Sequence, residues 1–104
     1  MPAPAPSYKK FTEITTSDLV NYLRLYETTA EDLVLLQTIL EAAKSYVLTY
    51  TGRKTHDADT FPEFTIAVYV LSEDMFDKRT YIVDSDTSNK IVDSILGSRS
   101  INLL

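Results

Sequence analysis

The chain has 104 residues, of which 44% are hydrophobic and 24% charged, and its ten Lys and Arg against fifteen Asp and Glu give a net charge of −5. This length suffices for one hydrophobic core and is too short for a cofactor domain joined to a substrate domain, which excludes most large enzyme folds. The absence of cysteine excludes disulfides, thiolate zinc sites and a cysteine nucleophile. The acidic balance opposes a non-specific grip on nucleic acid, because that affinity grows with the number of phosphates that basic side chains neutralise.

Glycine and proline usage favours helices over a turn-rich sheet protein. The chain has two glycines, Gly52 and Gly97, and its prolines are concentrated at the N-terminus, whereas sandwiches and barrels need many tight turns. No apolar run approaches the roughly 20 residues that span a bilayer, and the start of the sequence lacks the basic and apolar regions of a signal peptide. We therefore expect a helical protein that is made and kept in a cytoplasm, without contact to a membrane.

The N-terminal segment, residues 1–13, begins with alternating Pro and Ala. This composition favours an extended, polyproline-like backbone, and we predict a flexible arm there. A helical domain is expected over residues 14–97. Its first helix begins directly after Thr15, because Thr15 and Asp18 have the spacing of a capping box. The apolar spacing predicts that this helix ends around residues 25–27.

A second capping box, Thr29 with Asp32, precedes the longest helix that the sequence predicts. The apolar positions that follow at alternating spacings of three and four residues are Leu33, Leu36, Leu40, Ala43, Val47 and Tyr50. Three more apolar residues, Leu35, Ile39 and Tyr46, widen the stripe. The helix, about 30 Å long at 1.5 Å per residue, is therefore expected to bury more than one flank. Gly52 is expected to end it in the left-handed conformation.

The remaining elements are shorter. Residues 53–60 are predicted to form a polar loop before a third helix that opens with Pro62. The buried face of that helix is expected to comprise Ile66, Ala67, Val70, Leu71 and Met75. Residues 81–83 are a short extended candidate. A fourth helix, stopped by Gly97, is predicted to carry Ile91, Val92, Ile95 and Leu96. The predicted fold is an all-α, small bundle of about four helices with one long central helix, the flexible arm and an extended tail over residues 98–104.

No constellation in the sequence predicts catalysis or a metal site. His56 with Asp57 and Asp59 lacks the second cluster that would complete a coordination shell, and the group is typical of a solvated turn. The sequence has neither the G-x-S-x-G elbow of a serine hydrolase nor a glycine-rich loop that cradles phosphate. The carboxylates within residues 73–77 precede the basic pair 78–79 at helical spacing, which indicates a solvated, paired face. We therefore predict no enzyme, no cofactor and no bound metal.

Aromatic residues are numerous for so small a chain, with seven Tyr and four Phe. Four of them are candidates to be left for a neighbouring protein to cover, namely Tyr8, Phe11, Phe61 and Phe64. A DNA-binding helix-turn-helix built from the first two helices ranks last among the functions considered. Its recognition helix would begin Ala30-Glu31-Asp32 and would direct carboxylates toward phosphate.

The order of these parts resembles the small head–tail connector proteins of tailed bacteriophages over about residues 14–104. The residues that carry the resemblance are the capped segment 15–24, the long helix ending in Tyr50-Thr51-Gly52-Arg53-Lys54, Pro62 at the start of the third helix, and Met75-Phe76-Asp77-Lys78-Arg79 after it. The close of the chain is similar to that of family members from phages and prophages of Gram-positive bacteria, and it reads Ile95-Leu96-Gly97 and then Ser100-Ile101-Asn102-Leu103-Leu104. The Pro/Ala segment departs from the family pattern by its length.

The resemblance implies a non-enzymatic virion protein that is assembled from the host cytoplasm. Such a protein forms a ring, dodecameric by the resemblance, beneath the portal protein. The ring extends the channel and provides the platform for the next connector or tail-completion protein, while DNA passes through without specific binding. We expect the C-terminal docking tail to contact the portal or a neighbouring subunit through Gly97, Arg99, Ile101, Asn102, Leu103 and Leu104. We expect neighbouring copies to meet through the long helix at Leu35, Ile39 and Tyr46.

A second hypothesis comes from another functional class. In it the chain is a cytoplasmic helical regulator that binds a protein partner through its second and third helices and has no role in a virion. Ring formation on phage heads distinguishes the two hypotheses, because the regulator has no reason to assemble at a portal vertex.

Overall fold

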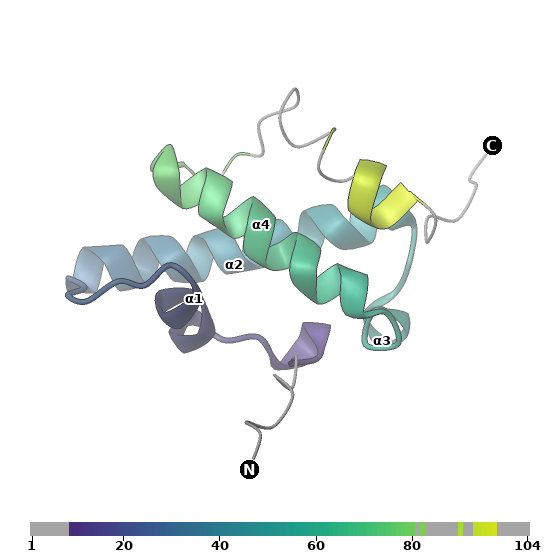
Figure 1. The fold of residues 1–104 in the computed structure, drawn as a ribbon, viewed down its shortest axis with the longest axis horizontal. Helices are drawn as coiled ribbons and strands as arrows, with labels where there is room; N and C mark the ends of the chain where they lie inside the picture. The colour runs from purple at the N-terminus through teal and green to yellow at the C-terminus, as the bar shows by residue number, and fades with distance from the viewer. Residues whose placement is uncertain (1–8, 81, 83–89, 91–92, 98–104) are drawn as a thin grey trace, which may run out of the picture.

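The structure, a computed structural model, describes residues 9–80, 82, 90 and 93–97. The regular elements in these ranges are the 3-10 helix η1 (Phe11–Glu13) and the α-helices α1 (Thr16–Tyr22), α2 (Ala30–Thr51), α3 (Thr55–Ala58) and α4 (Pro62–Asp77). Residues 93–96 are helical as well. Figure 1 shows α2 as the long element along which the other helices gather. The predicted all-α bundle around one long helix is thus confirmed.

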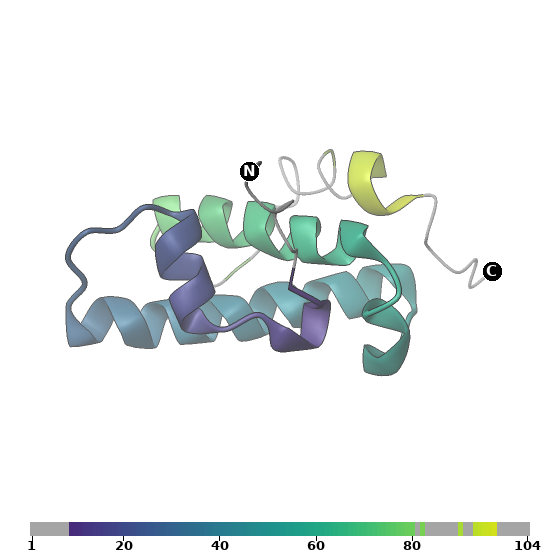
Figure 2. The same cartoon turned by 60° about the horizontal axis from the view of Figure 1, so that its bottom comes forward.

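The core lies where α4 runs back across α2 in the opposite direction (Figure 1). The side chains buried there from α2 are Leu36, Ile39, Leu40, Ala43 and Val47, and those from α4 are Phe64, Ala67, Val68, Leu71, Met75 and Phe76. α1 lies across one side of this pair (Figure 2) and adds the buried Leu19. Spacings of three and four residues place each set on one face of its helix, which is why the helices bury a common core.

Local signals start α1 and α2 at the predicted residues. The hydroxyls of Thr15 and Thr29 each accept a hydrogen bond from the backbone N–H three residues further on. The carboxylates of Asp18 and Asp32 in turn accept from the backbone N–H of the capping threonine, at 2.8 and 3.3 Å. Gly52 follows α2 at φ 70°, in the left-handed region where a residue with a side chain is strained by about 1–2 kcal/mol.

α1 is shorter than its apolar spacing predicts. It ends at Tyr22, before the predicted range of 25–27. The chain leaves the helix through Arg24 at φ 57°, and the Leu25 N–H donates to the Val20 carbonyl at 3.1 Å. A left-handed residue with this bond across it is a common way to end a helix, although glycine usually occupies the position.

The folded domain begins earlier than predicted, because residues 9–13 pack against it. Phe11 is buried and meets the Phe64 ring edge-on, with 6.3 Å between the ring centroids. Thr12 donates two hydrogen bonds to the Asp59 carboxylate, from its N–H at 2.9 Å and from its hydroxyl at 2.8 Å. The predicted arm is therefore wrong for these residues, and so is the expectation that Phe11 and Phe64 are left for a neighbour to cover.

The other two aromatic side chains of that expectation differ from each other. Phe61 is half-buried, and the guanidinium of Arg53 lies over its ring at 4.9 Å from the centroid. Tyr8 lies with residues 1–8 outside the described residues.

The buried face of α4 differs in part from the prediction. The expected residues Ala67, Leu71 and Met75 are buried. Ile66, in contrast, is 40% exposed, and Val70 is half-buried. The face is centred on Phe64 and Val68, and a residue two positions from either points about 200° away on a helix. Ile66 is two positions from both, which directs it to the outside.

The connecting segments also depart from the prediction. Residues 53–60, expected to be a loop, contain the short helix α3. The helical residues 93–96 agree with the predicted fourth helix, and Leu96 is buried; Ile91 and Val92 lie outside the described residues. Gly97 is absent from the glycines with positive φ, so the left-handed stop expected there is wrong. Of the extended candidate over residues 81–83, only the exposed Ile82 is among the described residues.

Candidate functional site

Exposed apolar side chains are the feature of this fold that calls for an interaction partner. Within the described residues, the large apolar side chains that face solvent are Tyr22, Tyr26, Leu33, Val34, Ile66 and Ile82. Single exposed apolar residues are normal, whereas groups of them mark places where another surface binds. Two such groups can be defined here.

The first group, which we call the α2 face, comprises Leu33 and Val34 at the start of α2, with Gln37 one turn on and Thr16 and Ser17 of α1. These five residues line a groove of about 390 Å³ whose walls are mostly apolar. Val34 is 68% exposed because it lies two residues before the buried Leu36 and so points away from the core. The hydroxyl of Thr16 donates to Gln37 Oε1 at 2.6 Å and holds the two helices together across the groove.

A second, more polar hollow of about 530 Å³ shares Thr16, Ser17 and Gln37 with this groove and continues along the same flank of α2. Its remaining lining residues are Ile14, Thr15, Leu40, Glu41 and Lys44. Lys44 donates to the Ile14 carbonyl at 3.1 Å, and burial lowers the pKa of its ammonium below the ordinary value. The α2 face therefore adjoins a structured depression, which gives the flank a shape that a partner can recognise.

The second group, which we call the tyrosine face, comprises Tyr22 of α1 with Ile66, Tyr69 and Val70 of α4. The rings of Tyr22 and Tyr69 are stacked, with 4.8 Å between centroids and 17° between planes. Ile66 is one helical turn from Tyr69 and Val70 and extends the apolar surface beside the rings. Burial raises the pKa of both tyrosines, and a hydrogen bond with Glu73 raises that of Tyr22 further.

The two faces lie on opposite sides of the α2–α4 pair. α2 and α4 pack on each other through their buried stripes. Val34 is two residues from the buried Leu36 and Ile66 is two residues from the buried Phe64 and Val68, so each points about 200° away from the stripe of its own helix. One molecule thus presents two unlike apolar surfaces in opposed directions.

The residues predicted to join neighbouring copies lie elsewhere. Ile39 is fully buried in the core of its own chain, which makes its assignment to an intersubunit surface wrong. Leu35 and Tyr46 are half-buried and pack against the core. Tyr46 stacks on Tyr50 at 6.3 Å, and the Tyr50 hydroxyl donates to the Asp93 carboxylate. This flank of α2 therefore meets the helical residues 93–96 of the same chain.

The C-terminal residues predicted to dock are only partly described. Gly97 is exposed, and a Cβ added to it would meet no atom within 4 Å. Arg99, Ile101, Asn102, Leu103 and Leu104 lie outside the described residues. Sequence reasoning missed Val34 and Ile66 as surface residues, and for Val34 a signal existed, since it lies outside the spacing of three and four that marks the buried stripe.

Charged side chains in the described residues are arranged in pairs. His56 is exposed and lies 3.5 Å from the Asp57 carboxylate, and no group of three or more His, Asp or Glu in the described ranges could hold a metal ion. Asp74 is paired with Lys78 at 3.1 Å. Arg79 lies 3.4 Å from Asp32, at the start of the helix considered for DNA recognition. Among the described helices none is long and apolar enough to cross a membrane.

Comparison of this chain with models of known protein families, with curated proteins and with solved structures finds no match.

Proposed function

We propose that the chain is a structural head–tail connector of a tailed phage or prophage. In this function it forms a ring beneath the portal protein, extends the DNA channel, and provides the platform for the next connector or tail component. The observation that carries the proposal is the presence of two unlike apolar faces on opposite sides of the molecule, the α2 face and the tyrosine face. It joins the resemblance of the ordered sequence elements to the connector family.

Two unlike faces are what a ring requires. In a cyclic assembly larger than a dimer each subunit contacts the next through a different surface from the one that receives the previous subunit. A contact of the α2 face of one copy with the tyrosine face of the next satisfies this condition, and it covers Val34 and Ile66 together. The shape complementarity of groove and tyrosine rings, not Leu35, Ile39 and Tyr46, then forms the intersubunit contact.

The charge of the chain agrees with a channel that DNA traverses. The net charge of −5 gives a lumen that repels phosphate, whereas a basic lumen would neutralise phosphates and hold the passing DNA. The tail from Gly97 to Leu104, with Ile101 and Leu103 at alternate positions, remains our proposed attachment to the portal. Apolar residues at alternate positions suit a segment that adds to a strand edge or fills a groove of its partner.

The experiment that tests the ring contact is the substitution Val34→Asp. Because Val34 is exposed, we expect the free energy of unfolding to change by no more than about 0.5 kcal/mol. A carboxylate in the apolar contact between copies is costly, so ring formation on DNA-filled, tailless phage heads should be lost. The matched control is Thr49→Asp, which adds the same charge at an exposed position of the same helix about 22 Å away along its axis. Equal ring formation by both variants would contradict the proposed contact.

A further inference from the structure

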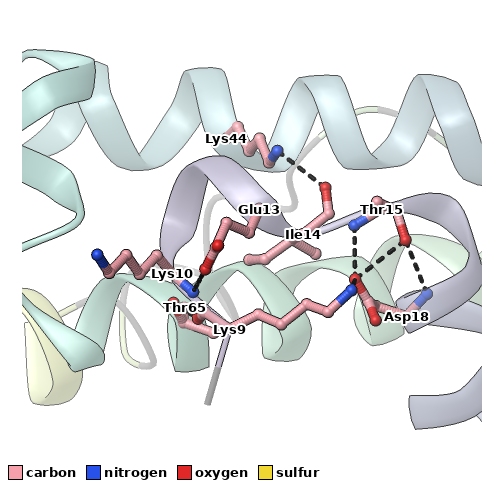
Figure 3. A network of polar contacts seen from close by, with 8 residues as sticks. All are labelled: Lys9, Lys10, Glu13, Ile14, Thr15, Asp18, Lys44 and Thr65. Atoms are coloured by element: carbon pink, nitrogen blue, oxygen red, sulfur yellow. Dashed lines mark hydrogen bonds and ion pairs between the residues drawn. The ribbon is translucent and has the colours of Figure 1, made fainter. Parts of the chain in front are cut away.

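The place where the described chain begins points to an occupant for the tyrosine face. Lys9 lies between α1 and α4, as Figure 3 shows: the Thr65 hydroxyl donates to its backbone carbonyl at 2.8 Å, and its ammonium lies 3.1 Å from the Asp18 carboxylate. Asp18 is four residues before Tyr22 on α1, and Thr65 is four residues before Tyr69 on α4. Each contact of Lys9 is therefore one helical turn from a tyrosine of the stacked pair.

This anchoring is firm. Burial alone would raise the pKa of Asp18, but hydrogen bonds from Thr15 and Lys9 lower it below its ordinary value, so the carboxylate is charged at neutral pH. The Lys10 N–H donates to Glu13 Oε1 at 3.0 Å, which fixes the next residue. Because Lys9 is covalently joined to residues 1–8, this segment starts beside the tyrosine face wherever it goes next.

The chemistry of residues 1–8 matches the chemistry of that face. The segment reads Met-Pro-Ala-Pro-Ala-Pro-Ser-Tyr, and such sequences favour the polyproline II helix, which has three residues per turn and needs no internal hydrogen bonds. With Pro and Ala alternating, every edge of that helix is apolar. Polyproline segments bind surfaces formed by aromatic rings, because proline rings pack on flat aromatic faces at little entropic cost. Tyr22 and Tyr69 provide the rings, and Ile66 and Val70 provide aliphatic surface beside them.

The length of the segment also fits. Eight residues of polyproline II helix span about 25 Å, whereas the tyrosine pair begins one helical turn, about 5.4 Å, from the residues that Lys9 contacts. The segment can therefore cover its own tyrosine face without strain. Covalent attachment at Lys9 gives it an effective concentration on the order of millimolar, which favours its own chain over a second copy.

We propose that residues 1–8 dock as a polyproline II helix on the tyrosine face of their own chain. Docking does not require the proposed function, but its consequence does. A connector subunit with this face covered offers only its α2 face, so free subunits do not polymerise, and the segment is displaced when subunits assemble on the portal.

The experiment uses the full chain, which has no cysteine, so that a nitroxide spin label attached through Ala3→Cys is unique. Paramagnetic relaxation by this label is read in the NMR spectrum. We expect loss of most of the Ile66 methyl signal and of the Tyr22 and Tyr69 amide signals, while the Val34 methyl signals on the opposite side keep their intensity. Replacing the three prolines in the segment with serine should restore the Ile66 signal. Full Ile66 intensity in the labelled chain would overturn the proposal.

Two further comparisons separate the alternatives. Tyr22→Ser should abolish the relaxation at Ile66, while Tyr26→Ser, which changes the 96% exposed tyrosine of the α1–α2 link, should leave it unchanged. If relaxation appears at Ile66 only when spin-labelled chain is mixed with unlabelled, isotope-labelled chain, then a second copy supplies the segment, and docking within one chain is wrong. These spectra are recorded without phage heads, so a failure of ring assembly does not alter their reading, and lost docking with intact rings leaves the proposed function standing.

Discussion

Two carboxylates hold the first described residues on the domain. Asp59 accepts both hydrogen bonds from Thr12, and those bonds lower its pKa below the ordinary value. Asp18 caps α1 and receives the Lys9 ammonium. Hydrogen bonds that involve a charged group stabilise a fold more than neutral ones do. The attachment of residues 9–13 therefore depends on the ionisation of these two side chains.

At Asp59 we predict that the substitution Asp59→Ala lowers the free energy of unfolding by about 1 kcal/mol, because two hydrogen bonds to a partly exposed carboxylate are lost. Urea unfolding followed by circular dichroism measures the change. Asp57→Ala is the matched control, since Asp57 has only the 3.5 Å contact with the exposed His56 among its printed ion pairs, and its effect should be within about 0.5 kcal/mol. An equal loss for both variants would contradict the role given to Asp59.

The same residues predict a dependence of stability on pH. The pKa values of Asp18 and Asp59 are lower in the folded chain than in the unfolded chain, so the folded state binds fewer protons. Their contribution to stability is fully present above the unfolded value of about 4 and is lost as the pH falls through the folded values. The free energy of unfolding should therefore decrease below about pH 4. The double variant Asp18→Asn and Asp59→Asn should show a flatter curve, and an unchanged slope would contradict this account.

At the scale of helices, the sequence predicts starts better than ends and faces. The capping boxes at Thr15 and Thr29 are local patterns, and both start a helix as predicted. The end of α1 at Arg24 and that of α4 at Arg79 use left-handed residues other than glycine, at φ 57° and 51°, which no local signal in the sequence reveals. The burial of α4 depends on η1, far away in the chain. Long-range packing of this kind sets which side of a helix is covered.

The rotation of α2 can be tested directly. Ile39 is fully buried, so Ile39→Ala should lower the free energy of unfolding by about 2–5 kcal/mol through lost burial and the cavity that remains. Val34→Ala on the α2 face should change it by less than about 0.5 kcal/mol. Chemical denaturation of the two variants provides the comparison. If Val34→Ala were the more damaging substitution, the placement of the core on α2 would be wrong.

The two glycines at helix ends should respond differently to substitution. Gly52→Ala places a Cβ at φ 70° and should cost about 1–2 kcal/mol. Gly97→Ala should change stability by less than about 0.5 kcal/mol, because its φ lies outside the left-handed region and an added Cβ meets no atom within 4 Å. Thermal unfolding of both variants measures the difference. A larger loss for Gly97→Ala would restore the left-handed stop first expected there.

At the scale of the whole molecule, the prediction of an all-α bundle was correct and the predicted contact between copies was not. Helical spacing and low glycine content were enough for the fold class. The contact was sought on the flank with Leu35, Ile39 and Tyr46, because an apolar stripe wider than one face indicates a second partner. That partner is partly the chain itself, through residues 93–96. Surfaces left for other molecules became visible only once the packing of α1 and α4 on α2 was known.

Assembly at a portal vertex is the central claim, and the mass of the purified protein by light scattering, followed by electron microscopy of DNA-filled, tailless phage heads mixed with it, tests that claim most directly. We predict a monomer in isolation, because residues 1–8 cover the tyrosine face, and a ring of density beneath the portal when heads are present. A monomer or simple dimer with no density at the vertex would contradict the connector function. The fold would stand in that case, and the cytoplasmic regulator would become the better hypothesis.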